Sequence, residues 1–94
     1  MPSRALSPNE ALGVIIRERR IGEGLTQEQL SFRAKLHRTY ISDLERGLKS
    51  PTLDVLESLA AALKTKAHIL LEAADLHRAR KTIPSTRRRF RRRS

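Results

Sequence analysis

The sequence predicts an all-α fold, in which a compact domain of five short helices precedes a basic C-terminal tail. Apolar residues recur three and four positions apart over most of the 94 residues, which is the spacing of one helix face. Ser7 and Thr26 each stand three residues before Glu or Gln, the pattern of a capping box at a helix start. Signals for strands are weak, because only 3% of the residues are aromatic and no apolar–polar alternation is sustained. A chain of this length is expected to form one domain.

The first helix is expected over residues 8–22. Ser7 is its cap, a proline fits its first turn, and Glu10 completes the capping box. Gly24 follows its end, and residues 1–7 are expected to form a lead-in. The inward stripe of this helix is expected to consist of Leu12, Ile15, Ile16 and Arg19.

A second helix is expected to begin at Gln27, because Thr26 and the glutamine three residues later form a capping box. Leu30 gives this helix its inward face. The pattern breaks at residues 35–37, where Leu36 is the one apolar residue and is expected to be buried in a tight turn.

A third helix then runs from about Arg38 to Arg46. Ile41 and Leu44 are three positions apart and are expected to point inward. Gly47 is expected to stop the helix, because glycine enters the left-handed conformation without penalty.

Two further helices follow a loop at residues 48–51. Thr52 is expected to cap the fourth, and residues 64–66 separate it from a fifth that runs from about Ala67 to Arg80. The apolar stripe of the fourth helix is Leu56, Leu59, Ala60 and Leu63. The fifth carries more apolar residues than a thin inward stripe requires: Ile69, Leu70, Leu71, Ala73, Ala74 and Leu76.

The net charge of +10 is concentrated at the C-terminal end. Residues 78–94 hold nine basic side chains and no acidic one, whereas residues 1–77 hold eleven basic and ten acidic side chains. The domain, assigned to residues 8–81, is therefore nearly neutral, and the overall charge is weak evidence that the domain itself binds nucleic acid. The Arg-rich tail, residues 82–94, has too little apolar surface to fold alone and is expected to be disordered.

Several classes of function are not expected from this sequence. The chain has no cysteine, its three histidines lack a metal-binding spacing, and no nucleophile motif is present, so we expect no metal, no cofactor and no enzyme activity. No apolar run approaches the length of about 20 residues that a membrane span needs, and nothing suggests a signal peptide. The expected location is therefore the cytoplasm.

Residues 25–47, LTQEQLSFRAKLHRTYISDLERG, resemble the helix-turn-helix of the lambda repressor/Cro-like (XRE-type) family of transcription regulators. The likeness covers roughly residues 12–71. Glycine usually stands in that family's turn where this chain has Lys35. Because a lysine at positive φ would cost about 1–2 kcal/mol, we expect the turn to bend differently here. The residues that fall at the family's places are Gln27, Leu30, Ser31, Ile41, Leu44, Glu45 and Gly47.

The resemblance implies a motif, residues 26–47, whose second helix lies in the major groove of double-stranded DNA with its first turn at the base edges. Arg38 can then bond a guanine at two atoms, and the methyl group of Thr39 can touch that of thymine. Gln27 is expected to bind a phosphate and to brace Arg38 or Thr39. The predicted DNA contacts are Gln27, His37, Arg38, Thr39, Tyr40, Ser42, Asp43, Arg46 and Lys49, with Ser50 as a further phosphate contact.

Some of these contacts have competing interpretations. His37 is more readily a helix cap than a contact to phosphate or base. The ring of Tyr40 can pack against the edge of the domain, and Asp43 can pair with Arg46 rather than face cytosine.

The resemblance also implies two structural features. Arg20 and Glu45 are expected to form a partly buried ion pair. The surplus apolar residues of the fifth helix are expected to form a homodimer through Leu70, Leu71 and Ala74. A dimer would place two motifs about 34 Å apart on a palindromic operator.

The expected function is sequence-specific transcription regulation, and the run RTYISDLERG looks especially like the controller proteins of restriction–modification systems. The alternative is an antitoxin that silences a partner toxin and regulates its own gene through the same motif. RNA polymerase is another conceivable protein partner. The arginine tail has three interpretations: it displaces counterions from nucleic acid, enters a narrow minor groove, or binds RNA or an anionic membrane surface.

Overall fold

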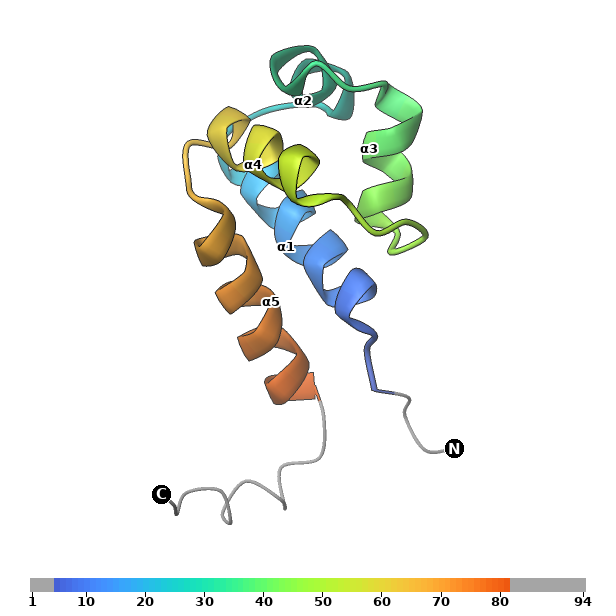
Figure 1. Cartoon of the computed structure of the whole chain (residues 1–94), viewed down its shortest axis with the longest axis vertical. Helices are drawn as coiled ribbons and strands as arrows, with labels where there is room; N and C mark the ends of the chain where they lie inside the picture. The colour runs from blue at the N-terminus through green and yellow to red at the C-terminus, as the bar shows by residue number, and fades with distance from the viewer. Residues whose placement is uncertain (1–4, 82–94) are drawn as a thin grey trace.

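The computed structural model describes residues 5–81, and within this range the chain forms five α-helices and no strand. The all-α prediction is therefore confirmed, while the tail at residues 82–94 lies outside the described residues. The helices are α1 (Pro8–Gly22), α2 (Gln27–Ala34), α3 (Arg38–Glu45), α4 (Leu53–Ala62) and α5 (Ala67–Lys81) (Figure 1). No helix in this range is long and apolar enough to cross a membrane.

The helices are arranged around α1. This helix packs against α5 along its length and against α3, while α2 packs against α3 and α4 (Figure 1). The motif formed by α2 and α3 thus lies at one end of the molecule, with α1 beneath it. This arrangement holds α3 at the surface with one face against the domain.

Side-chain caps fix three of the helix starts, as the sequence predicts. The hydroxyl of Ser7 accepts a hydrogen bond from the backbone N–H of Glu10 at 3.1 Å, and the Glu10 carboxylate accepts one from Ser7 N–H at 2.9 Å. Thr26 and Gln29 repeat this reciprocal pair at 3.0 and 2.9 Å. Thr52 caps α4 by accepting from the backbone N–H of residue 55 at 3.2 Å. Each cap satisfies backbone donors that have no partner within the helix.

The core consists of the apolar stripes that face one another between the helices. Its largest fully buried side chains are Ile16, Leu30, Ile41, Leu44, Leu59, Leu63 and Leu70. One expectation for α1 is wrong: Arg19 does not belong to the inward stripe and is only partly buried, whereas Arg20 is 9% exposed. Both arginines lie four positions after a buried isoleucine, and the hydrogen bonds of Arg20 to Glu45 and Leu25 hold it inward.

The turn of the motif differs from our expectation. Lys35 adopts the left-handed conformation, with φ 59° and ψ 44°, so the lysine takes the geometry that glycine usually supplies. The N–H of Leu36 donates to the carbonyl of Ser31 at 2.9 Å, which closes the end of α2. The predicted different bend is therefore wrong. The contacts of the turn hold Lys35 in its strained conformation, while Leu36 is partly buried against the core as anticipated.

Two glycines set how close α3 lies to α1. A Cβ at Gly13 would lie 2.6 Å from the carbonyl oxygen of Glu45 and closer still to that of Leu44. Gly47 ends α3 with φ +77°, and a Cβ there would lie 2.8 Å from the Cα of Glu10. Both ends of the contact between α1 and the α3 segment therefore depend on backbone approaching backbone without an intervening side chain.

Candidate nucleic-acid interface

Helix α3 has one face in the core and its first turn at the surface. Ile41 is fully buried and Leu44 is 2% exposed, which fixes the rotation of the helix about its own axis. Arg38 and Thr39 are exposed at its start, and Tyr40 is partly buried against the core. The predicted base-contacting residues Arg38 and Thr39 thus share the free end of a helix whose back is anchored.

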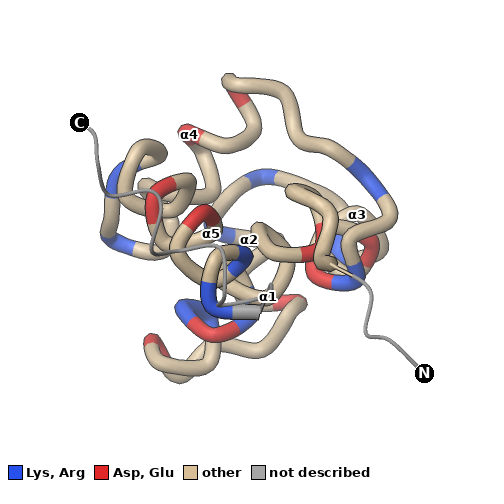
Figure 2. The backbone as a smooth tube through the Cα atoms, turned by 90° about the horizontal axis from the view of Figure 1, so that it is seen from below, with Lys and Arg blue, Asp and Glu red and all other residues tan. Residues whose placement is uncertain are grey.

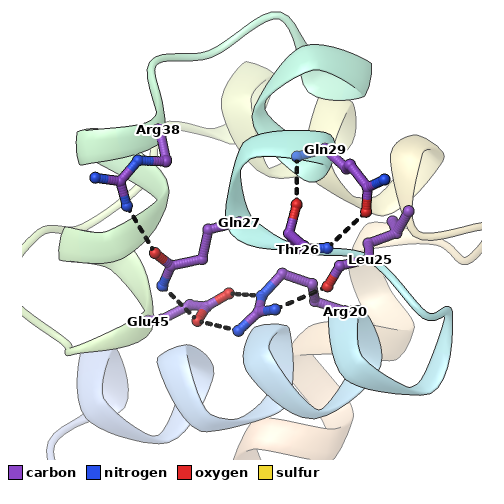
Figure 3. Close-up of polar contacts among 7 residues, drawn as sticks. All are labelled: Arg20, Leu25, Thr26, Gln27, Gln29, Arg38 and Glu45. Atoms are coloured by element: carbon purple, nitrogen blue, oxygen red, sulfur yellow. Dashed lines mark hydrogen bonds and ion pairs between the residues drawn. The ribbon is translucent and has the colours of Figure 1, made fainter.

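A buried ion pair lies below this helix (Figure 3). Arg20 Nε donates to Glu45 Oε2 at 2.6 Å, and Arg20 Nη2 donates to Oε1 of the same carboxylate at 3.1 Å. The third guanidinium contact is Nη1 to the backbone carbonyl of Leu25 at 2.8 Å. The side chains are 11% and 3% exposed, so the predicted pair of Arg20 and Glu45 is present and is largely withdrawn from water.

Gln27 connects the buried pair to the start of α3. Its side-chain amide Nε2 donates to Glu45 Oε1 at 3.0 Å, and its amide oxygen accepts from Arg38 Nη1 at 3.3 Å (Figure 3). The two bonds use both ends of one amide, so the orientation of the amide is fixed by the carboxylate on one side and the guanidinium on the other. We call the series Arg20, Glu45, Gln27 and Arg38 the arginine relay. It supplies the brace that the sequence predicted for Arg38.

Salt bridges cover the C-terminal end of α3. Arg46 Nη2 lies 3.1 Å from Asp43 Oδ1, and Lys49 Nζ lies 3.8 Å from Asp43 Oδ2. The Asp43 side chain is only 17% exposed, while the two cations are 64% and 55% exposed. Asp43 therefore neutralises charge within the protein, which is the second of its two predicted roles, and Arg46 and Lys49 keep their outer surfaces free.

His37 corrects one expectation. It occupies the position before α3 with an extended backbone, but its side chain makes no capping hydrogen bond. The ring is exposed instead. An imidazole is a poorer cap than the short side chains of Ser, Thr, Asp or Asn, whose oxygen reaches the backbone of the first turn.

A hollow beside the arginine relay includes a residue that sequence reasoning missed. The hollow has a volume of about 420 Å³ and lies between α1 and α3, with Gln27 of α2 on its wall. Arg17 of α1 lines it together with Ser42 and Arg46. The one sequence signal that could have found Arg17 is its position three residues before Arg20, which places both on neighbouring rows of the same helix.

The fifth helix corrects two predicted dimer contacts. Leu70 is fully buried and Ala74 is 6% exposed, so both belong to the core of the single subunit and have no surface to offer a partner. Leu71 is 46% exposed and Leu76 is 53% exposed. Helix α5 therefore carries apolar side chains beyond those that the core needs, and the large ones that remain exposed are Leu71 and Leu76.

Charge over the described domain is mixed. Figure 2 shows basic and acidic positions interspersed along the backbone. Among the residues that the structure describes, no group of three His, Cys, Asp or Glu side chains is placed to hold a metal ion.

The helix-turn-helix family model HTH_3 matches residues 16–70, which is more than half of the chain. The control protein C.BamHI of Bacillus amyloliquefaciens is 41% identical over 61 residues, which cover 64% of this chain and 75% of C.BamHI. Other relatives are longer. An uncharacterized HTH-type transcriptional regulator of Mycobacterium tuberculosis is 36% identical over 64 residues, which cover 68% of this chain and 46% of that protein.

Solved structures share the fold. The clp gene regulator ClgR from Corynebacterium glutamicum superposes with a TM-score of 0.79 at 29% identity over 83% of both chains. The restriction-modification controller protein C.AhdI from Aeromonas hydrophila does so with a TM-score of 0.64 at 36% identity, over 65% of this chain and 92% of that one. The biofilm regulator SinR in complex with DNA gives 0.62 at 31% identity, over 64% and 97% of the two chains.

Proposed function

This chain belongs to the XRE-type helix-turn-helix family of DNA-binding transcription regulators, and from this premise we propose that it acts as a homodimer on a palindromic operator. Each subunit would insert the first turn of α3 into the major groove. The observation that carries the proposal is the arginine relay. It holds an exposed Arg38 at the tip of a helix whose opposite face is buried.

Arg38 and Thr39 would supply the sequence information. An arginine guanidinium can bond O6 and N7 of guanine together, and a threonine methyl can contact the methyl of thymine. Because Gln27 already holds one nitrogen of Arg38, the guanidinium loses less rotamer freedom on meeting a base than a free side chain would.

Phosphate contacts would come from the residues around the hollow between α1 and α3. Gln27 lies at the start of α2, where backbone N–H groups and the helix dipole favour an anion. Ser42 and Arg46 line the same hollow, and we add Arg17 to them because it completes the wall from the α1 side. Lys49 would reach the backbone beyond the end of α3. Such contacts fix the register of the protein on DNA but carry no sequence information.

The dimer would form through α5. Leu71 and Leu76 are large apolar side chains that remain about half exposed in the subunit. Covering them in a two-fold interface would remove that surface from water and place two copies of α3 about 34 Å apart, one turn of the duplex.

Within the family, we favour a controller protein of a restriction–modification system. C.BamHI and C.AhdI carry that description, and the chain covers 75% and 92% of their respective lengths. A controller of this kind would respond to its own concentration through dimerisation, for which α5 is the proposed surface.

The Arg-rich tail, residues 82–94, lies outside the described residues, and its six arginines are proposed to raise affinity for any duplex. Arginines that neutralise phosphates release counterions, so binding that they strengthen falls steeply as salt rises. Such a contribution changes the salt dependence of binding and leaves the preferred sequence unaltered.

Selection of binding sites from random duplexes tests the proposal. The whole chain should yield a palindromic consensus. Arg38→Ala should weaken operator binding by about 1–3 kcal/mol, roughly 5- to 150-fold, and relax the preference at one position of each half-site. Arg33→Ala removes an exposed arginine from α2 outside the arginine relay and is the matched control, for which the consensus should stay the same. Deleting residues 82–94 should lower the salt slope without changing the consensus.

Two results would overturn this function. One is a selection that yields no consensus for the whole chain. The other is an Arg38→Ala variant that binds the operator as tightly and as selectively as the parent chain.

A further inference from the structure

A second hollow lies between α2 and α4, away from the arginine relay. It has a volume of about 480 Å³. Three of its lining residues are Ala34, Ala61 and Ala62, whose short side chains leave the space open. We call its other lining residues the rim; they are Arg33, Lys35, Ser58 and Lys64. We call it the α2–α4 hollow.

Both lysines of the rim have a backbone conformation that costs free energy. Lys35 has φ 59° and Lys64 has φ 60°, and they are the two non-glycine residues with positive φ within the described part of the chain. Each follows the end of a helix, where glycine would adopt this conformation without penalty and lysine costs about 1–2 kcal/mol. A positive charge at a helix C-terminus recovers about 0.3–1 kcal/mol of that cost. That compensation does not explain why both strained residues border the same hollow. Strained residues persist where the surroundings hold them and often mark binding sites.

The rim carries three positive charges, and within the described range no carboxylate lines the hollow. The nearest recorded counter-charge is Glu23, whose Oε1 lies 3.9 Å from Lys64 Nζ. Lys64 is 69% exposed in that pair, and exposed pairs of this kind contribute little, so an incoming anion can displace the glutamate. The rim thus consists of one arginine, two lysines and one serine, and each of these side chains can donate hydrogen bonds to a ligand.

The α2–α4 hollow and the arginine relay share no residue. The hollow is lined by residues of α2, of α4 and of the turns that follow them. The relay joins α1, the start of α2 and α3, as Figure 3 shows.

We propose that the α2–α4 hollow binds a small polyanion that carries two or more phosphate groups. The hollow is a shallow, open depression, so a ligand there would be held by charge and hydrogen bonds rather than by enclosure. Arginine and lysine together recognise phosphate through charge-assisted hydrogen bonds, and three cations around one space match a ligand with several negative charges. Lys35 stands three residues before Arg38, so a bound ligand would also hold the turn that leads into α3. The hollow would bind this ligand whether or not the chain binds an operator.

Backbone NMR of the full chain titrated with inorganic tripolyphosphate tests the proposal, because it separates the hollow from the arginine tail residue by residue. The amides of Lys35, Ser58 and Lys64 should shift together and saturate. The double variant Lys35→Gly/Lys64→Gly should weaken this binding at least 10-fold. Glycine accepts the φ of both positions, so the double variant should unfold at the same or a higher temperature than the parent.

The control removes the same number of charges elsewhere. Lys66→Gln/Arg80→Gln alters two exposed cations that do not line the hollow and should leave the affinity within about twofold of the parent. A short duplex without an operator, added at the same phosphate concentration, distinguishes nucleic acid from a free polyphosphate.

Three outcomes would overturn the inference. Tripolyphosphate shifts confined to residues outside the hollow would do so, as would an equal loss of binding in both double variants. A duplex that shifts Lys35 and Lys64 where tripolyphosphate does not would assign the hollow to nucleic acid instead. Each result is distinct from a failed operator selection, because it is read at the α2–α4 hollow.

Discussion

At the scale of single residues, the most consequential feature is a pair of charges in the core. Burying Arg20 and Glu45 removes both from water, and such pairs seldom stabilise a fold more than apolar residues of equal size would. In this domain, the hydrogen bonds of both side chains offset the free-energy cost of removing the charges from water. Arg20 makes three hydrogen bonds, and the Glu45 carboxylate also accepts from Gln27. Removing one partner leaves the other charge buried without its counter-charge.

Glu45→Gln should therefore destabilise the domain by about 3 kcal/mol, at the lower end of the range for breaking a buried pair. The amide keeps the size of the side chain but cannot neutralise Arg20. Urea unfolding followed by circular dichroism measures the change.

Glu18→Gln is the control, because Glu18 lies exposed on α1, and it should change the unfolding free energy by no more than about 0.5 kcal/mol. Equal losses in the two variants would contradict a special role for the buried pair.

Sequence reasoning succeeded for residues whose partners are close in the chain. The caps at Ser7 and Thr26 depend on a neighbour three positions away, and both are present. Reasoning failed where the surroundings decide. Lys35 takes a left-handed conformation because the contacts of the turn outweigh its local preference. The apolar surplus of α5 was visible in the sequence, but which of Leu70 and Leu71 faces the core depends on the rotation of the helix against α1.

At the scale of helices, the contact between α1 and α3 determines where α3 lies. Gly13 lets the carbonyls of Leu44 and Glu45 approach the α1 backbone. The observed α3 ends at Glu45, one residue before the predicted end at Arg46. The other predicted boundaries agree closely with the observed helices. The role of Gly13 was not predicted, because a glycine within a helical pattern gives no indication of what lies opposite it.

Gly13→Ala should destabilise the domain by about 1–3 kcal/mol, the usual cost of an added group in a packed interior. The methyl group would meet backbone rather than a flexible side chain, so α3 must move away from α1. Operator affinity should fall as well, because the first turn of α3 would shift relative to Gln27. Thermal unfolding and gel-shift titration measure the two effects.

Gly22→Ala in the same helix is the matched control. An added Cβ there meets nothing within 4 Å, so stability should stay the same or rise by up to about 1 kcal/mol. A Gly13→Ala variant as stable as Gly22→Ala would show that α1 and α3 are free to separate.

At the scale of the whole molecule, the proposed function requires two copies of the domain. The single subunit leaves Leu71 and Leu76 about half exposed on α5, whereas Leu70 and Ala74 hold that helix to α1 and the core. The buried side chains of α5 thus stabilise the fold of the subunit, and its exposed leucines are available for the proposed dimer.

Leu71→Asp should weaken dimerisation at least 10-fold without unfolding the subunit, because the substitution places a charge in the proposed apolar interface. Sedimentation equilibrium measures the dissociation constant.

Phe32→Asp makes the same exchange at a residue of α2 that is 86% exposed, and it should leave the dimer intact. A parent chain that binds its operator while remaining monomeric would refute this interface.

The arginine relay has a consequence for how such regulators diversify. Arg38 is tied through Gln27 to a carboxylate in the interior, whereas Thr39, one position along, is an exposed residue at the same helix start. A gene duplicate acquiring a new target sequence can therefore exchange position 39 at little cost to its architecture. Exchanging Arg38 removes the hydrogen-bond donor to the Gln27 amide oxygen, while the nitrogen of that amide stays bonded to Glu45. The two proposed base contacts, Arg38 and Thr39, thus differ in how freely they can be exchanged.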